Sequence, residues 1–358
     1  MENYEVRFIE RCFYMFHDIN LDDLFDLQKK EAHTLIDVRS SSEFEEATIP
    51  GSINIPLFSD EERAKVGTLY KQVGKEEAKQ KGLEIFSAKL PNFIKQFQKV
   101  DTPMTVFCWR GGMRSRTAAT VLDLMGIHAN RLHGGIRSYR QWVVHELDQF
   151  NDRSFPPNLY VLNGYTGSGK TIILHKLAER GYPMIDLEDL AGHRGSIFGQ
   201  IGLKPNKQKK FDSLLVHVMK RFQNEPFIFI EGESKRIGKA MLPEFIYNKK
   251  EKGKQIFIHL PFELRVKIIL DEYDPEDYSG NFIEAFQHIK KHIHTPIAKK
   301  IEKSLQIGDY ITSVKLLLEY YYDPRYEHHA KKFSSDQITN IHAETIDEAV
   351  HKIELLIK

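Results

Sequence analysis

The segment NLYVLNGYTGSGKTIILHKLAERG, residues 158–181, runs from a continuous apolar stretch through a glycine-rich loop into a pattern of helical spacing. A strand that leads into Gly-X4-Gly-Lys-Thr and then into a helix is the context of a phosphate-binding P-loop. The amides of such a loop surround a diphosphate, its lysine adds positive charge, and its threonine is able to hold Mg²⁺. We therefore expect a diphosphate ester, whose remainder the motif does not specify, to bind Gly164, Thr166, Gly167, Ser168, Gly169, Lys170 and Thr171.

A second loop, FCWRGGMRS at residues 107–115, has a similar context earlier in the chain. It follows the apolar run MTVFC, and the spacing in RSRTAATVLDLMG predicts a helix that ends at Gly126. Two glycines let the loop amides turn inward, and Arg110 and Arg114 add positive charge, which favours the thiolate form of Cys108. We expect these three residues to be catalytic, with an inert buried cysteine as the alternative. Cys12 lacks such surroundings, and both cysteines are expected to be free thiols.

Length and composition suggest a two-domain protein without membrane segments. A chain of 358 residues is too long for one ordinary core, and Lys and Arg (51) nearly balance Asp and Glu (50). Residues 1–13 carry charges where a signal peptide is apolar, so we expect a cytoplasmic protein. We place domains at 1–150 and 151–358, joined by the polar segment NDRSFPPN at 151–158.

Both halves alternate apolar strands with helical patterns, which predicts an α/β fold with parallel sheets and function at the carboxyl ends of the strands. Strands are expected at residues 33–38, 51–56, 104–108, 158–164, 182–189, 226–234 and 254–261. Residues 60–100 are expected to be helical, with interruptions at Gly67, Gly74 and Gly82. Residues 275–326 are expected to form a helical region, followed by a final strand and helix at 337–358.

Polar residues follow two strands of the second half and are candidates for acid, metal or ligand contacts. The segment DLEDLAGHRGSIFG, residues 186–199, contains Asp186, His193 and Arg194. The segment EGES, residues 231–234, contains Glu231 and Glu233. Alternatively, His193 is an ordinary surface histidine and the two glutamates pair with Lys235 and Arg236.

Residues 199–260 carry an excess of basic side chains in KPNKQKK (204–210), SKRIGK (234–239) and NKKEKGK (248–254). Either these lysines are a solvated surface, or they bind the phosphate backbone of a nucleic acid.

The first half resembles a rhodanese domain. DVRSSSEFEEATIPGSINIP (37–56) is similar to the signature that opens this family, and LHGGIRSYRQW (132–142) to its closing Gly-Gly segment. Rhodanese cysteines carry sulfur as a persulfide. Five residues (109–113) separate Cys108 from Arg114, where single-domain rhodaneses tend to have four, and the wider spacing is that of tyrosine phosphatases and rhodanese-like cell-cycle phosphatases.

The ordered set of motifs resembles the tRNA 2-selenouridine synthase family over nearly the whole chain, including ERAKVGTLYKQVG (62–74) and YYYDPRY (320–326). The resemblance implies that wobble uridine 34 of tRNA is first geranylated on the sulfur of 2-thiouridine, from geranyl diphosphate. Selenium from selenophosphate then replaces the S-geranyl group by way of a selanyl group on Cys108. It further implies that tRNA binds through its anticodon arm and that a selenophosphate-supplying enzyme is a transient partner. No tightly bound cofactor and no membrane partner are expected.

Within this resemblance, the aromatic residues of YYYDPRY either stack on a base, line the geranyl pocket or form an ordinary helix core. An ATP-dependent sulfurtransferase or kinase-like enzyme acting on a small molecule is the main alternative function. A signalling phosphatase is a second one, against which stands Phe107 where such phosphatases have histidine.

Overall fold

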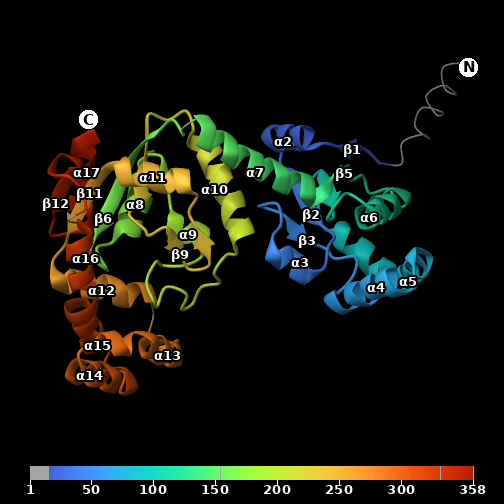
Figure 1. The fold of residues 1–358 in the computed structure, drawn as a ribbon. Helices are drawn as coiled ribbons and strands as arrows, with labels where there is room; N and C mark the ends of the chain where they lie inside the picture. Colours follow the sequence, from blue (N-terminus) through green and yellow to red (C-terminus); the bar gives the residue numbers. More distant parts are fainter. Residues whose placement is uncertain (1–15, 154, 274, 331, 358) are drawn as a thin grey trace, which may run out of the picture. The chain divides into compact units, whose positions relative to one another are not determined.

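The computed structural model describes residues 16–153, 155–273, 275–330 and 332–357; Cys12 lies outside these ranges. The chain forms two compact units that divide after Asp148, inside helix α7 (Gly135–Arg153) (Figure 1). Residues 151–153 of the expected joint are therefore helical. Within the described ranges, no helix is both long and apolar enough to cross a membrane.

The first unit contains a five-stranded parallel sheet in the order β1-β5-β4-β2-β3. Its core packs β2 and β4 against α5 and α6 through residues such as Ile36, Val106, Phe97 and Leu122. The expected rhodanese-like α/β architecture is confirmed, with β4 in the middle of the sheet. The strands are β1 (Asp18–Ile19), β2 (Thr34–Asp37), β3 (Ile53–Asn54), β4 (Met104–Phe107) and β5 (Asn130–Leu132). The helices are α2 (Leu21–Lys30), α3 (Ser41–Glu46), α4 (Asp60–Gln72), α5 (Lys75–Phe97), α6 (Met113–Leu124) and α7.

The helical stretch between β3 and β4 is interrupted once, between α4 and α5 at Gly74. The expected interruptions at Gly67 and Gly82 are wrong, because both residues lie inside helices. A glycine costs a helix interior only about 1 kcal/mol relative to alanine, which tertiary packing offsets. A Cβ at Gly82 would lie 3.4 Å from the Phe58 ring, so the missing side chain lets α5 approach that ring closely.

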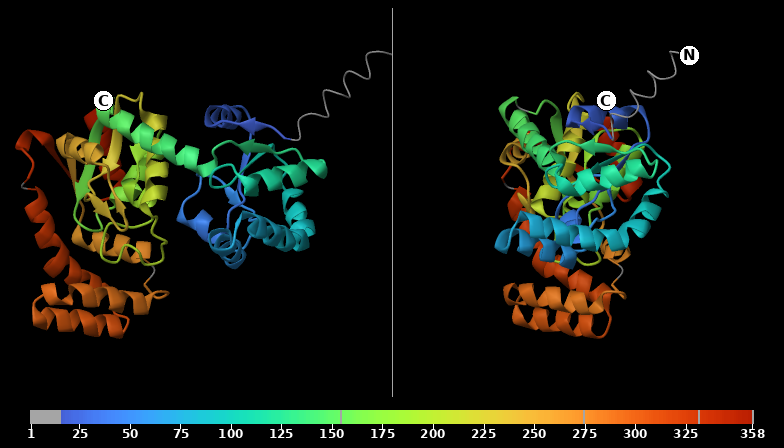
Figure 2. Two further views of the ribbon diagram at one scale, coloured as in Figure 1. Left: turned by 45° about the vertical axis from the view of Figure 1, so that its right-hand side comes forward. Right: turned by 90° about the vertical axis from the view of Figure 1, so that its right-hand side faces the viewer.

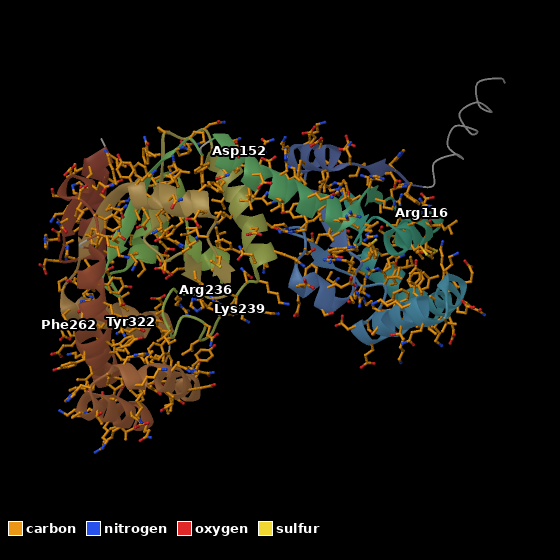
Figure 3. All side chains as sticks on the ribbon, viewed as in Figure 1. Arg116, Asp152, Arg236, Lys239, Phe262 and Tyr322 are labelled. Carbon is orange, nitrogen blue, oxygen red and sulfur yellow. The ribbon has the colours of Figure 1, made fainter. Side chains whose placement is uncertain are left out.

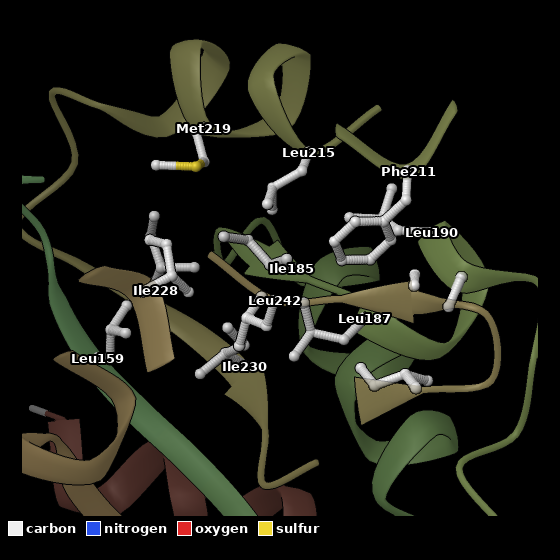
Figure 4. Packing of buried hydrophobic residues seen from close by; sticks show 14 of the residues in the cluster. Leu159, Ile185, Leu187, Leu190, Phe211, Leu215, Met219, Ile228, Ile230 and Leu242 are labelled. Atoms are coloured by element: carbon white, nitrogen blue, oxygen red, sulfur yellow. The ribbon is translucent and has the colours of Figure 1, made fainter. Parts of the chain in front are cut away.

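The second unit contains another five-stranded parallel sheet, in the order β12-β11-β6-β8-β7. Alternate residues of β6 and β8 face opposite layers. Leu159, Ile228 and Ile230 pack against α10 on one side (Figure 4). Leu162 and Phe229 pack against α8 and α17 on the other. The strands are β6 (Asn158–Gly164), β7 (Met184–Ile185), β8 (Phe227–Glu231), β11 (Lys254–His259) and β12 (Ile338–His342). The helices are α8 (Lys170–Glu179), α9 (Leu187–Ala191), α10 (Gln208–Phe222), α11 (Glu244–Lys252), α12 (Phe262–Tyr273) and α17 (Ile346–Ile357).

The strand expected at residues 182–189 is much shorter in the structure. Only Met184–Ile185 is extended, because the Asp186 side chain accepts a hydrogen bond from the Asp189 amide and begins helix α9. Strands β9 (Arg236–Ile237) and β10 (Ala240–Met241), which the sequence did not predict, form a small antiparallel hairpin after β8.

The helical region before β12 is confirmed as a cluster beside the second sheet (Figure 2). It consists of α13 (Ser279–Ile289), α14 (Thr295–Gln306), α15 (Tyr310–Leu317), a π-helical turn (Leu318–Tyr322) and α16 (Asp323–Ala330). Its core includes Phe282, Phe286, Ile301 and Leu317, and Phe198 of the long loop after α9 packs against it. The cluster is therefore joined to the loop that follows α9 through Phe198.

Candidate functional site

Cys108 directly follows β4 and is buried, with only 3% of its surface exposed. Its Sγ lies 3.2 Å from Ser115 Oγ on α6. Gly112 caps α6 without a side chain, so the first amides of that helix are left to the loop. Gly111 has φ +63°, and a Cβ there would lie 2.8 Å from the Leu132 carbonyl oxygen, so the turn requires glycine.

The two arginines of this loop have different surroundings. Arg114 donates hydrogen bonds to both carboxylate oxygens of Glu43, at 2.5 and 3.2 Å. Burial alone lowers the pKa of Arg114, but Glu43 and the nearby Cys108 raise it above its ordinary value. Arg110 is exposed. The structure thus brings Arg114 close to the sulfur and leaves Arg110 at the surface, and it adds Ser115 and Glu43, which sequence reasoning missed.

The Asp-X-Arg signature at 37–39 is a structural feature. Arg39 is 2% exposed and donates to both carboxylate oxygens of the fully buried Asp37 and, at 2.6 Å, to the Ala47 carbonyl oxygen. The Thr48 hydroxyl donates to the same carboxylate at 2.9 Å. This network ties the end of β2 to the loop before β3.

The glycine-rich loop follows β6, the middle strand of the second sheet, and opens α8. Gly167 and Gly169 have φ +76° and +67°, and a Cβ at Gly167 would lie 2.7 Å from the Arg265 carbonyl oxygen. Ser168 is 1% exposed, and its Oγ has no hydrogen-bond partner among the described residues. A buried hydroxyl without a partner costs about 1–3 kcal/mol, which a ligand that supplies a partner recovers.

Arg265 and Asp323, which we call the Arg265 bracket, support the backbone of this loop through hydrogen bonds. Arg265, 4% exposed, donates through Nε to the Thr166 carbonyl oxygen at 3.0 Å. Its two terminal nitrogens donate to Asp323 at 3.0 and 2.6 Å, and its guanidinium lies 4.9 Å from the Tyr165 ring centroid. Asp323 belongs to the quoted YYYDPRY motif, but no sequence signal distinguished Arg265.

Lys170 interacts electrostatically with three glutamates, Glu188, Glu231 and Glu233. Burial lowers the pKa of Lys170, but the surrounding acidic groups, including Glu233 and Glu188, raise it above its ordinary value. Burial and the Glu233 carboxylate raise the pKa of Glu188 to about 8. Burial and Glu188 raise the pKa of the fully buried Glu231 well above its usual range. The pKa values of both carboxyl groups are therefore raised by burial and by mutual repulsion.

Thr171 contacts two of these carboxyl groups. Its Oγ1 lies 2.8 Å from Glu231 Oε1 and 3.2 Å from Glu188 Oε2. A hydroxyl group donates one hydrogen, so both contacts are favourable only where one carboxyl group is protonated. The described residues contain no group of three or more His, Cys, Asp or Glu side chains arranged to hold a metal ion.

The remaining polar candidates hold loops in place. Asp186 caps α9 and lies 2.7 Å from His175 Nε2. His193 is packed between Gly199 and Gly238, and burial lowers its pKa. Arg194 donates to the Ile201 carbonyl oxygen at 2.8 Å and pairs with Glu272 at 3.1 Å. Asp186 and Arg194 are thus committed to contacts within the protein, whereas the buried Nδ1 of His193 has no hydrogen-bond partner among the described residues.

Comparison with known proteins assigns both units. Residues 20–141 match the rhodanese-like domain, and residues 157–282 match the tRNA 2-selenouridine synthase AAA domain. The tRNA 2-selenouridine synthase of Hydrogenovibrio crunogenus is 32% identical, over 83% of this chain and 89% of that protein. The chain belongs to the tRNA 2-selenouridine synthase family. The synthase of Sulfurovum sp. is 31% identical over 87% of this chain and 93% of its own length. The synthase of Nitrosomonas europaea is 36% identical over 72% of this chain and 67% of its own length.

Membership of the tRNA 2-selenouridine synthase family identifies the chain as an enzyme and turns attention to what borders the P-loop. A cavity lined by Thr166 of the loop extends into the helical cluster, where Phe198, Tyr273, Leu317 and Tyr322 line it. Among the residues that the structure describes, none of those that line it is charged. Its open space is about 50 Å³, and Figure 3 labels Tyr322 among the helices that enclose it. The YYYDPRY motif thus contributes to the core and to the cavity.

The basic segments of this tRNA 2-selenouridine synthase family member are only partly free to meet a nucleic acid. Lys250 is buried and pairs with Glu251, and Lys235 pairs with Glu244. Arg236 and Lys239 are exposed on the β9–β10 hairpin (Figure 3). Residues 199–260 therefore do not form one uniformly exposed basic surface.

Proposed function

We propose that this enzyme converts 2-thiouridine at wobble position 34 of tRNA into 2-selenouridine in two steps, one at each loop. At the P-loop the sulfur is geranylated from geranyl diphosphate. At the Cys108 loop selenium from selenophosphate replaces the S-geranyl group. The anticodon arm of tRNA is the macromolecular substrate.

In the first step the uridine sulfur attacks the first carbon of the geranyl chain, the carbon–oxygen bond breaks, and diphosphate leaves. Negative charge develops on the leaving oxygen, which amides of residues 164–171 and the Lys170 ammonium would stabilise. The raised pKa of Lys170 keeps its side chain charged throughout the physiological range. The partnerless Ser168 hydroxyl would gain an acceptor in the bound diphosphate.

The apolar cavity beside Thr166 is the observation that favours a prenyl diphosphate, rather than ATP, as the ligand of the P-loop. A prenyl diphosphate needs an anion-binding loop that adjoins an apolar chamber, whereas adenosine needs partners for several polar atoms. The cavity adjoins the loop, and the described residues of its lining carry no charged groups. Because its open space is only about 50 Å³, side chains such as Tyr273 and Tyr322 must move to admit a ten-carbon chain.

In the second step S-alkylation has turned the thiocarbonyl sulfur into a leaving group and made C2 more electrophilic. Selenium carried on Cys108 forms the new bond to C2, the C2–S bond breaks, and geranyl thiol leaves. A thiol co-reactant then attacks Cys108 Sγ and breaks the Sγ–Se bond, which frees 2-selenouridine and leaves Cys108 in a disulfide. Ser115, 3.2 Å from the sulfur, and Arg114, whose charge interacts with Cys108, would stabilise the anionic selanyl group.

Mass analysis of the wobble nucleoside tests the proposal. Purified enzyme with 2-thiouridine tRNA and geranyl diphosphate, without ATP, should give S-geranyl-2-thiouridine, and added selenophosphate should convert it to 2-selenouridine. Strict dependence on ATP, with no binding of geranyl diphosphate, would instead support the sulfurtransferase or kinase-like alternative.

A further inference from the structure

A large groove in the first unit borders the loop that contains Cys108. It encloses about 990 Å³ between α4, α5 and the loop, to which it is joined through Trp109, Arg110, Met113 and Arg114. Most residues of the ERAKVGTLYKQVG motif between positions 63 and 71 line it. We call it the α4–α5 groove. The two steps proposed above assign no role to this motif.

The floor and one wall of the α4–α5 groove are apolar. Phe58 and Phe86 are buried beneath it, whereas Leu83, Trp109 and Met113 are 68%, 39% and 57% exposed. Single exposed apolar side chains are ordinary on protein surfaces, but several that converge on one concave site indicate an apolar ligand.

The rim of the α4–α5 groove is basic. Arg63, Lys71, Lys75 and Lys79 line it, and none of the described lining residues carries a carboxylate. Lys79 pairs with Glu76 and Arg63 with Glu43, but neither Lys71 nor Lys75 takes part in an ion pair among the described residues. A groove with an apolar floor and positive side chains at its edge complements a ligand that combines a hydrocarbon with phosphate groups.

We infer that the α4–α5 groove binds the S-prenylated wobble nucleoside of the tRNA during the selenium step. The prenyl chain lies on the apolar floor, and phosphates of the anticodon strand lie at Lys71 and Lys75. The inference rests on the proposed function, and it explains why the apolar surface adjoins the cysteine loop. A released prenyl thiol would leave through the same groove.

Gly67 offers a clean way to fill the groove. It lies within α4 and lines the groove, and a Cβ at this position would have no atom within 4 Å. A tryptophan there has room for its Cβ, and we expect its ring to extend into the groove. Lys65 lies on the same helix and is exposed but does not line the groove, so Lys65→Trp is the matched control.

The test compares two anticodon stem-loop RNAs, one with S-geranyl- and one with S-methyl-2-thiouridine, as substrates for selenation with selenophosphate. Gly67→Trp should lower kcat/KM for the S-geranyl RNA by at least ~10-fold, the loss of contact with about two methylene groups, and change the S-methyl RNA little. Leu83→Ser, at a 68% exposed position, should give the same selectivity with a smaller effect. Lys65→Trp should affect neither RNA.

Equal loss for both RNAs, or no loss for either, would overturn the inference. So would competitive inhibition by free geranyl diphosphate that Gly67→Trp removes, because the groove would then belong to the prenyl donor. If the unaltered enzyme selenates neither RNA, the proposed function fails instead, and the two failures are thereby distinguished.

Discussion

The two loops share one backbone design but differ in the charges around them. Each follows a middle strand of a parallel sheet and opens a helix whose N-cap, Gly112 or Gly169, has no side chain. Arg114 lies near Cys108, whereas three glutamates surround Lys170. The backbone thus supplies anion affinity at both loops, and the side chains determine which anion is held.

This difference has a chemical consequence. A chalcogen anion on Cys108 meets positive charge, whereas a diphosphate at the P-loop meets carboxyl groups. Such a ligand binds well only where protons or a divalent cation neutralise those groups. The raised pKa values of Glu188 and Glu231 are consistent with protons in that role. Four substitutions test the contrast.

Replacing the sulfur should have the largest effect. Cys108→Ser should lower selenation by at least about a thousandfold, because a hydroxyl does not carry selenium, and S-geranyl tRNA should accumulate. Nucleoside mass analysis measures both products. Simultaneous loss of geranylation in a folded variant would show that the two loops do not divide the reaction.

Removing the P-loop lysine should have the opposite selectivity. Lys170→Ala should lower geranylation by roughly 10²–10³-fold, the usual cost of losing one group that stabilises developing charge. Selenation of pre-geranylated tRNA should persist. Lys176→Ala, further along α8 and paired at the surface with Asp347, is the control. An unaltered geranylation rate in Lys170→Ala would assign the loop another ligand.

Much of the contrast between the two loops could be predicted from the sequence, because the patterns that identify each loop lie within short segments. The strands, the loops and Cys108 at the end of β4 follow from apolar runs and glycine spacing within short segments. Family motifs added the order of the units. Asp186 also stood out locally, although its contacts proved to be those of a helix cap.

The partners of the loops could not be predicted, because they come from distant segments. Glu43 reaches Arg114 across 71 positions, and Arg265 reaches Asp323 across 58. Such pairs depend on how helices cross the sheets, which no periodicity in one segment encodes. The same holds for Gly67, whose importance appears only when α4 is placed beside the cysteine loop.

The Arg265 bracket predicts an effect of intermediate size. Arg265→Lys keeps the charge but cannot make both contacts to Asp323 and the contact to Thr166, so KM for geranyl diphosphate should rise roughly tenfold. The second unit should lose about 1–3 kcal/mol of stability. Lys315→Ala, which removes an exposed pair with Glu263, should change stability by less than about 1 kcal/mol.

Stability of the second unit has to be measured by hydrogen exchange in β6 and α8. Both tryptophans, Trp109 and Trp142, lie in the first unit, so their fluorescence does not report on the second. Equal exchange rates in Arg265→Lys and the unaltered enzyme would mean that the bracket does not hold the loop.

The smallest predicted effect concerns the pH dependence of stability. The pKa of Glu188 is raised to about 8 in the folded protein, from 4.5, so the folded state binds more protons between these values. Its contribution to stability is therefore present at low pH and lost as pH rises toward 8. Glu188→Gln removes this loss, so its stability relative to the unaltered enzyme should increase between pH 5.5 and 8.5, on the order of 1 kcal/mol or more.

Glu302→Gln is the informative control for this shift. Hydrogen bonds from Lys290 and Gln287 lower the pKa of Glu302, so this side chain is ionised above pH 5.5 in both the folded and the unfolded state. The effect of Glu302→Gln on stability should therefore not vary with pH in this range. Glu231 limits the stability that Glu188→Gln is expected to gain. In this variant Glu231 no longer faces the Glu188 carboxylate, so it ionises more readily. A Glu188→Gln curve parallel to that of the unaltered enzyme would mean that no proton is held at Glu188, and the P-loop would then need a divalent cation to accept a diphosphate.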